Sequence, residues 1–169
     1  EVDTQRQTAR TDIRTLNYDE LVFATGSRPF IPPIDGHQLP HVHGFRTLAD
    51  VDAILGGKGN AVVLGGGLLG VEAAAALCAR GIPVTLIHRQ PWLMDIQLNQ
   101  QAGLLLEEHL AERGIHCQLN CGIERISETS VTLSNGEILP AGRVIIATGV
   151  KPNIALAQQA GIACQRGIS

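Results

Sequence analysis

Residues 65–70, with the sequence GGGLLG, constrain the fold of this 169-residue chain more than any other segment. They follow an apolar run at 61–64 and precede a helical pattern over Leu68–Arg80, which Gly81 is expected to end. The spacing G-x-G-x-x-G between a strand and a helix is typical of a dinucleotide-binding turn. The segment therefore predicts a βαβ unit that holds a pyrophosphate at the amino-terminal end of its helix.

Each glycine of this turn has its own expected role. Gly65 makes the tight turn, Gly67 lets a pyrophosphate approach the backbone, and Gly70 lets the helix pack closely on the strand. A tight turn without a ligand is the alternative. Glu72 is either a polar partner near the nicotinamide or a carboxylate that complements the helix dipole. The residues expected to contact the cofactor here are Gly65, Gly67, Leu68, Leu69, Gly70 and Glu72.

The end of the second strand, over residues 84–87, is where a carboxylate usually binds the adenosine ribose. His88 and Arg89 stand there instead. Arg89 suits a 2′-phosphate and His88 a ribose oxygen, and the alternative is that both are solvated loop residues. NADH and NADPH both stay possible, with a slight preference for NADPH because a carboxylate is missing.

Strand and helix patterns alternate through the middle of the chain. Helices are expected over residues 48–55, 68–80 and 99–113, and strands over 61–64, 84–87 and 115–119. Such alternation favours a parallel sheet. Short strands at 123–126, 131–133 and 137–139, with the hairpin signal Asn135-Gly136, favour an antiparallel meander. The predicted fold class is α/β, a Rossmann-like parallel sheet with helices on both faces and a three-stranded antiparallel meander.

Two segments of the chain have similar sequences. Leu21–Phe23 leads into Ala-Thr-Gly at 24–26, and Val144–Ile146 leads into Ala-Thr-Gly at 147–149. A basic residue and a proline follow in both places. Each apolar run predicts a short buried strand, and the glycine at its end allows a ligand or another backbone to come close.

Composition and charge exclude several function classes. A net charge of −3 and 3% aromatic residues argue against nucleic acid and anionic membrane as partners. The longest apolar run, Ala73–Ala79, is too short to span a bilayer, and no signal peptide opens the chain. Cys117 and Cys121 match neither a zinc nor a redox pair, and the histidines at 37, 41 and 43 are expected to be solvated. We expect no metal and a cytoplasmic location.

Taken in order, these motifs resemble the flavin-dependent pyridine nucleotide–disulfide oxidoreductases, in which a nicotinamide-binding domain is inserted into a flavin-binding domain. The resemblance implies that residues 1–35 are a flavin-domain remnant, 36–149 the NAD(P)H-binding domain and 150–169 a return segment into the flavin domain. It also implies that Thr25, Gly26 and Arg28 lie near FAD and that Gly149 lies near the nicotinamide.

An additional glycine motif for FAD is missing from the sequence, as is the Gly-Asp segment that holds the flavin in this family. FAD is therefore expected in an intact parent protein and not in this chain, which begins at Glu1 and is expected to be part of a longer one. Hydride transfer between a nicotinamide and a flavin needs no protein acid or base, so no catalytic side chain is assigned.

The segment Trp92–Asn99, followed by Gln101–Gly103, resembles the large subunit of NAD(P)H-dependent nitrite reductases. Asn99 is a good helix cap in its own right. The resemblance implies a parent that reduces nitrite to ammonium and carries a siroheme and iron–sulfur part. A rubredoxin- or ferredoxin-type reductase and a non-catalytic nucleotide-sensing module are the alternatives.

Overall fold

The computed structural model describes residues 1–169 and divides into two compact units. One unit comprises Glu1–Arg28 and Val150–Ser169, and the other comprises Pro29–Gly149. None of the helices combines the length and apolarity that crossing a bilayer requires.

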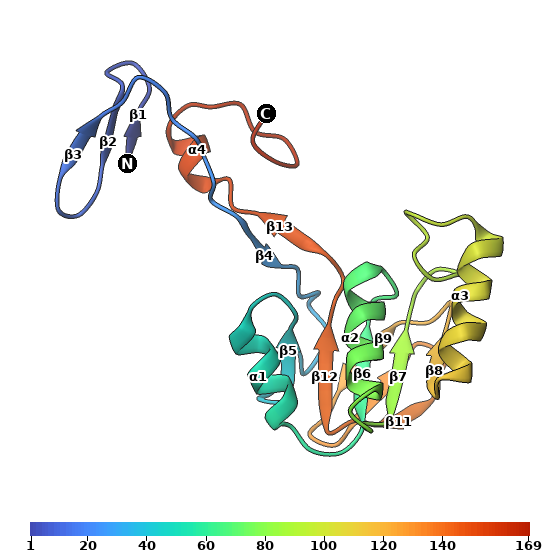
Figure 1. The fold of residues 1–169 in the computed structure, drawn as a ribbon. Coiled ribbons are helices and arrows are strands. Elements are labelled where there is room, and N and C mark those ends of the chain that lie inside the picture. The colour runs from blue at the N-terminus through green and yellow to red at the C-terminus, as the bar shows by residue number, and fades with distance from the viewer. The chain divides into compact units, whose positions relative to one another are not determined.

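The larger unit is built on a five-stranded parallel sheet in the order β5-β12-β6-β7-β8 (Figure 1). Its strands are β5 (Val42–Gly44), β6 (Ala61–Leu64), β7 (Val84–Ile87), β8 (Ile115–Gln118) and β12 (Arg143–Ile146). All four residues of β6 and all four of β12 are buried, as the apolar runs at 61–64 and 144–146 predict. The expected parallel sheet is confirmed.

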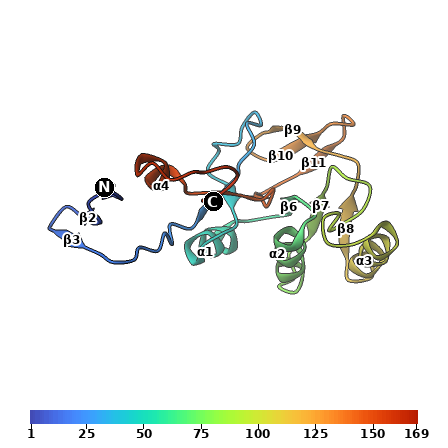
Figure 2. The ribbon, with the colours of Figure 1, turned by 90° about the horizontal axis from the view of Figure 1, so that it is seen from above.

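Three helices cover one face of this sheet (Figure 2). They are α1 (Leu48–Gly56), α2 (Leu68–Cys78) and α3 (Gln100–Glu112). Thr47 caps α1 in a capping box with Asp50, and the Asn99 side chain accepts from the N–H of Ala102 to cap α3. Small residues of α2, Ala73 and Ala74, are buried against the sheet and let the helix approach it closely.

An antiparallel three-stranded sheet covers the opposite face (Figure 2). The prediction of helices on both faces is therefore wrong. Its strands are β9 (Ile123–Ile126), β10 (Ser130–Leu133) and β11 (Ile138–Pro140), in the order β11-β10-β9. Val131 and Leu133 of β10 are fully buried in one cluster with Val62 and Leu64 of β6. The predicted meander thus fills the space that a second layer of helices would need.

The smaller unit contains an antiparallel sheet of β1 (Val2–Asp3), β2 (Thr8–Arg10) and β3 (Thr15–Asn17), and the short helix α4 (Ala155–Gln159). Where the chain passes between the units, β4 (Ser27–Pro29) pairs with β13 (Val150–Pro152). Next to that pair, Thr25 Oγ1 donates to the Asn153 carbonyl at 2.6 Å and the Asn153 N–H donates to the Gly26 carbonyl at 2.9 Å. The stretches that follow the two Ala-Thr-Gly sequences, 27–29 and 150–152, therefore lie side by side.

The strand expected at Leu21–Phe23 is absent. Val22 is 85% exposed, and no strand of the same unit pairs with this segment. An apolar run becomes a buried strand only where neighbouring strands and a covering layer exist. Its counterpart is β12, which lies between β5 and β6 and is buried throughout.

Candidate dinucleotide-binding site

The glycine turn joins β6 to α2 with a geometry that only glycine permits at two positions. Gly65 has φ of 118°, and a Cβ there would lie 2.4 Å from the carbonyl oxygen of Ala147. A Cβ on Gly70 would lie 1.7 Å from the carbonyl oxygen of Gly65. Side chains at either position would push the helix away from the sheet, so the turn is tight because both are glycine.

Gly67 differs from these two glycines because the space around it is open. Its φ of −78° suits any residue, and a Cβ there would meet no atom within 4 Å. Gly67 is also the N-cap of α2, and no side chain caps the free N–H groups of the first turn. The open space and the free donors fit an anionic group bound against the backbone.

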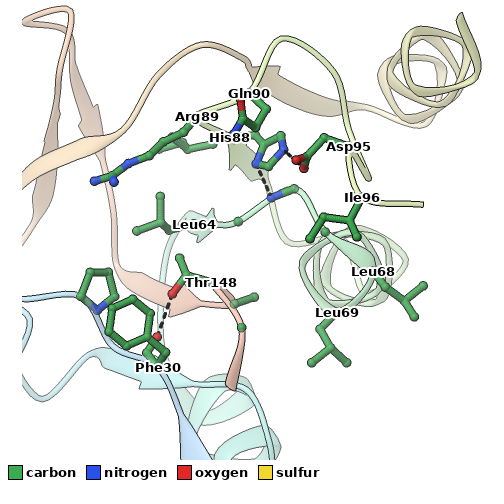
Figure 3. A pocket seen from close by; sticks show the side chains of 17 residues that line it. Phe30, Leu64, Leu68, Leu69, His88, Arg89, Gln90, Asp95, Ile96 and Thr148 are labelled. Atoms are coloured by element: carbon green, nitrogen blue, oxygen red, sulfur yellow. Dashed lines mark hydrogen bonds and ion pairs between the residues drawn. The ribbon is translucent and has the colours of Figure 1, made fainter. Parts of the chain in front are cut away.

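A cavity of about 440 Å³ opens over this turn, within the larger unit (Figure 3). The amino-terminal end of α2, the end of β7, and the segment 147–149 after β12 all contribute to its lining. Thr148 Oγ1 donates to the Phe30 carbonyl at 2.7 Å, which fixes the wall opposite the β7 end. The lining is Phe30, Pro32, Leu64, Gly65, Gly66, Gly67, Leu68, Leu69, Ile87, His88, Arg89, Gln90, Asp95, Ile96, Ala147, Thr148 and Gly149.

His88 is bonded to the protein at both ring nitrogens. The N–H of Gly66 donates to Nδ1 at 3.0 Å, and Nε2 lies 2.9 Å from Asp95 Oδ1. Because Nδ1 accepts, the proton sits on Nε2 and is donated to Asp95. The ring therefore has no free donor for a ribose oxygen, and it holds the β7 end, the glycine turn and Asp95 together (Figure 3).

Arg89 lines the same cavity but points away from Asp95 (Figure 3). Its Nε lies 3.1 Å from where a Cβ on Gly122 would be, so the side chain extends over the connection from β8 to β9. The residue is exposed. Its guanidinium is open to an anion on that side of the cavity.

The structure brings together most of the residues predicted to contact the dinucleotide. Those that line the cavity are Gly65, Gly67, Leu68, Leu69, His88, Arg89 and Gly149. Gly70 lies beneath the turn, where it sets the packing of α2, and Glu72 is exposed on α2 outside the lining. Thr25, Gly26 and Arg28, the expected neighbours of FAD, belong to the smaller unit.

Sequence reasoning missed several lining residues, of which Asp95 is the only carboxylate. It lies seven residues beyond His88, in the loop that leads to α3. Met94 turns this loop with φ of 52°, and its N–H donates to the Gly66 carbonyl at 2.8 Å. An acidic residue in the loop after the second strand is the only signal in the sequence that points to it.

The model of the family described as pyridine nucleotide-disulphide oxidoreductase matches residues 1–169. The chain belongs to that family. Its four cysteines, Cys78, Cys117, Cys121 and Cys164, are all unpaired thiols, so this part of a family member carries no disulfide.

Two relatives within the family come from Bacillus subtilis (strain 168). The chain is 41% identical to an assimilatory nitrate reductase electron transfer subunit and 40% identical to a nitrite reductase [NAD(P)H]. Each alignment covers 99% of this chain but only 23% and 22%, respectively, of those proteins. The chain therefore spans less than a quarter of the length of these curated relatives.

Two solved structures of reductases share the fold. A NAD-dependent persulfide reductase from A. fulgidus has a TM-score of 0.88 at 34% identity, over 98% of this chain and 33% of that one. A ferredoxin reductase from Rhodopseudomonas palustris has a TM-score of 0.92 at 27% identity, over 99% of this chain and 44% of that one.

Proposed function

We propose that residues 36–149 bind NAD(P)H at the glycine turn. The observation that carries the proposal is the open space over Gly67, where uncapped N–H groups of α2 face a cavity of about 440 Å³. Pyrophosphate would accept from these N–H groups. Gly56 is equally open, and Gly67 differs from it in lining the cavity at the uncapped start of a helix.

We further propose that the bound coenzyme gives a hydride to FAD in the parent protein, which is the chemistry that the coenzyme supplies. Thr148 and Gly149 would position the nicotinamide, because they line the wall fixed by Phe30. Glu72 is the proposed polar partner beyond the cavity rim. Residues 1–35 and 150–169 would belong to the flavin domain, with Thr25, Gly26 and Arg28 near the flavin. No residue needs to move a proton for this transfer.

The proposed parent reaction is reduction of nitrite to ammonium, with a siroheme and iron–sulfur part as the electron acceptor. Its support is the similarity of this chain to a nitrite reductase and to a nitrate reductase electron transfer subunit. Reduction of a ferredoxin or rubredoxin is the second candidate, favoured by the ferredoxin reductase of similar fold.

Stopped-flow spectroscopy of the intact flavoprotein containing this chain tests the proposal. NAD(P)H should bleach the flavin, and nitrite should then reoxidise it; with NAD(P)H in excess, repeated cycles should supply the six electrons that release of each ammonium requires. Reoxidation by ferredoxin or rubredoxin but not by nitrite would favour the second candidate. A flavin that NAD(P)H does not reduce would contradict both and point to a nucleotide-sensing module.

A further inference from the structure

The cavity contains a carboxylate close to the place where an acidic residue binds the coenzyme ribose in dinucleotide-binding folds. That place is the end of β7, and His88 occupies it here. Asp95 Oδ1 lies 2.9 Å from His88 Nε2, and Asp95 lines the cavity. The carboxylate missing from the strand end is thus supplied by the loop that follows.

Two contacts with the glycine turn fix the position of Asp95. Gly66 donates its N–H to His88 and accepts from the N–H of Met94, the residue next to Asp95. The N–H and the carbonyl of Gly66 therefore both hold the segment from His88 to Met94 against the turn. This places Asp95 beside His88 at the end of β7, the strand end at which a carboxylate binds the adenosine ribose in this type of site.

Asp95 has accepting capacity left for a ligand. Oδ1 accepts from His88, whereas Oδ2 has no hydrogen-bond partner within the protein. The side chain is 25% exposed and lines the cavity, so a ligand can reach it. A carboxylate oxygen in this position suits a hydroxyl donor and disfavours an anion.

We infer that Asp95, held by His88, binds the adenosine ribose hydroxyls and makes the site selective for NADH over NADPH. The inference rests on the proposed binding of a nicotinamide dinucleotide. A 2′-phosphate would meet the Asp95 carboxylate, and Arg89 points away from it (Figure 3). His88 acts as a positioning residue, because its ring nitrogens are already engaged.

Titration of NADH and NADPH into this chain by calorimetry tests the inference. Wild-type protein should bind NADH about 10-fold or more tightly than NADPH, because one charge-assisted hydrogen bond is gained and one like-charge contact is avoided. Asp95→Asn keeps the bond from His88 but removes the charge. It should weaken NADH about 10-fold and leave NADPH unchanged or tighter. The exposed Asp52→Asn is the matched control.

Positioning by His88 has its own test. His88→Gln should reduce the ratio of NADH to NADPH affinity in wild-type protein, but should change that ratio little when Asp95 is already Asn. An Asp95→Asn variant with the wild-type ratio would contradict the inference. So would a wild-type preference for NADPH that Arg89→Ala abolishes. Binding of neither coenzyme by wild type would contradict the proposed function as well as the inference.

Discussion

The guanidinium of Arg143 on β12 donates a hydrogen bond of 2.8 Å to the carbonyl oxygen of Ile54 on α1. It also donates to the carbonyls of Gly57 and Gly59, just beyond the end of that helix. Arg143 is 4% exposed and is the only charged residue in the buried core. A single side chain thus satisfies carbonyl groups that the helix end leaves without intrahelical partners.

Replacing Arg143 by Met should lower the free energy of unfolding by about 3 kcal/mol, because the carbonyl oxygens of Ile54, Gly57 and Gly59 each lose a hydrogen bond from a charged donor. Urea unfolding followed by circular dichroism measures this. Arg113→Met, at an exposed arginine after α3, is the control and should change stability by less than about 0.5 kcal/mol. Equal effects of the two substitutions would contradict a structural role for Arg143.

Asp50 should stabilise α1 in a pH-dependent way. Burial alone would raise the pKa of Asp50, but hydrogen bonds from Thr47 and from the Arg46 N–H outweigh this and hold the pKa below its ordinary value. Because the folded-state pKa is lowered, the stabilisation is present above the unfolded pKa, about 4. It is lost as the pH falls through the folded value.

Asp50→Asn should therefore destabilise the protein at pH 7 and have a smaller effect as the pH is lowered below about 4. Denaturant midpoints across this range measure the difference from wild type. Asp52→Asn, at an exposed position on the same helix, should show no such trend. A pH-independent effect of Asp50→Asn would rule out the charge as its cause.

Cys117 should be a poorly reactive thiol. Burial, with a smaller contribution from nearby Glu107, raises its pKa to about 11. At pH 8 only about a thousandth of such a thiol is thiolate, the form that reacts. Iodoacetamide labelling followed by peptide mass spectrometry should modify Cys117 more slowly in the folded protein than in the protein unfolded by urea. Labelling of Cys117 at the same rate would contradict the burial argument.

The parallel sheet and its helix boundaries follow closely from local sequence. Strand β7 spans Val84–Ile87 as predicted, and Thr47 and Asn99 cap their helices through their own side chains. Such features depend on near neighbours along the chain. The kind of layer that covers each face of the sheet does not depend on near neighbours, since a meander and a helix can both cover an apolar sheet surface. The segment at Leu21–Phe23 shows the same limit, because its apolar run says nothing about what lies beside it.

The candidate site divides in a similar way. The glycine turn was predictable because its spacing, strand and helix lie within one short segment. The pairing of His88 with Asp95 was not, because it depends on how the loop after β7 folds back onto Gly66. The sequence indicated a site without a carboxylate, whereas the structure places one in the cavity.

Calorimetric titration of NADH into wild-type protein, Gly67→Val and Gly56→Val tests whether the dinucleotide binds at the glycine turn. A Cβ at either glycine meets no protein atom within 4 Å, and neither φ is positive, so both variants should fold. Wild type and Gly56→Val should bind alike, and Gly67→Val should bind at least about 100-fold more weakly, because its side chain fills the space for the pyrophosphate. Equal NADH affinity in all three proteins would contradict binding at the glycine turn.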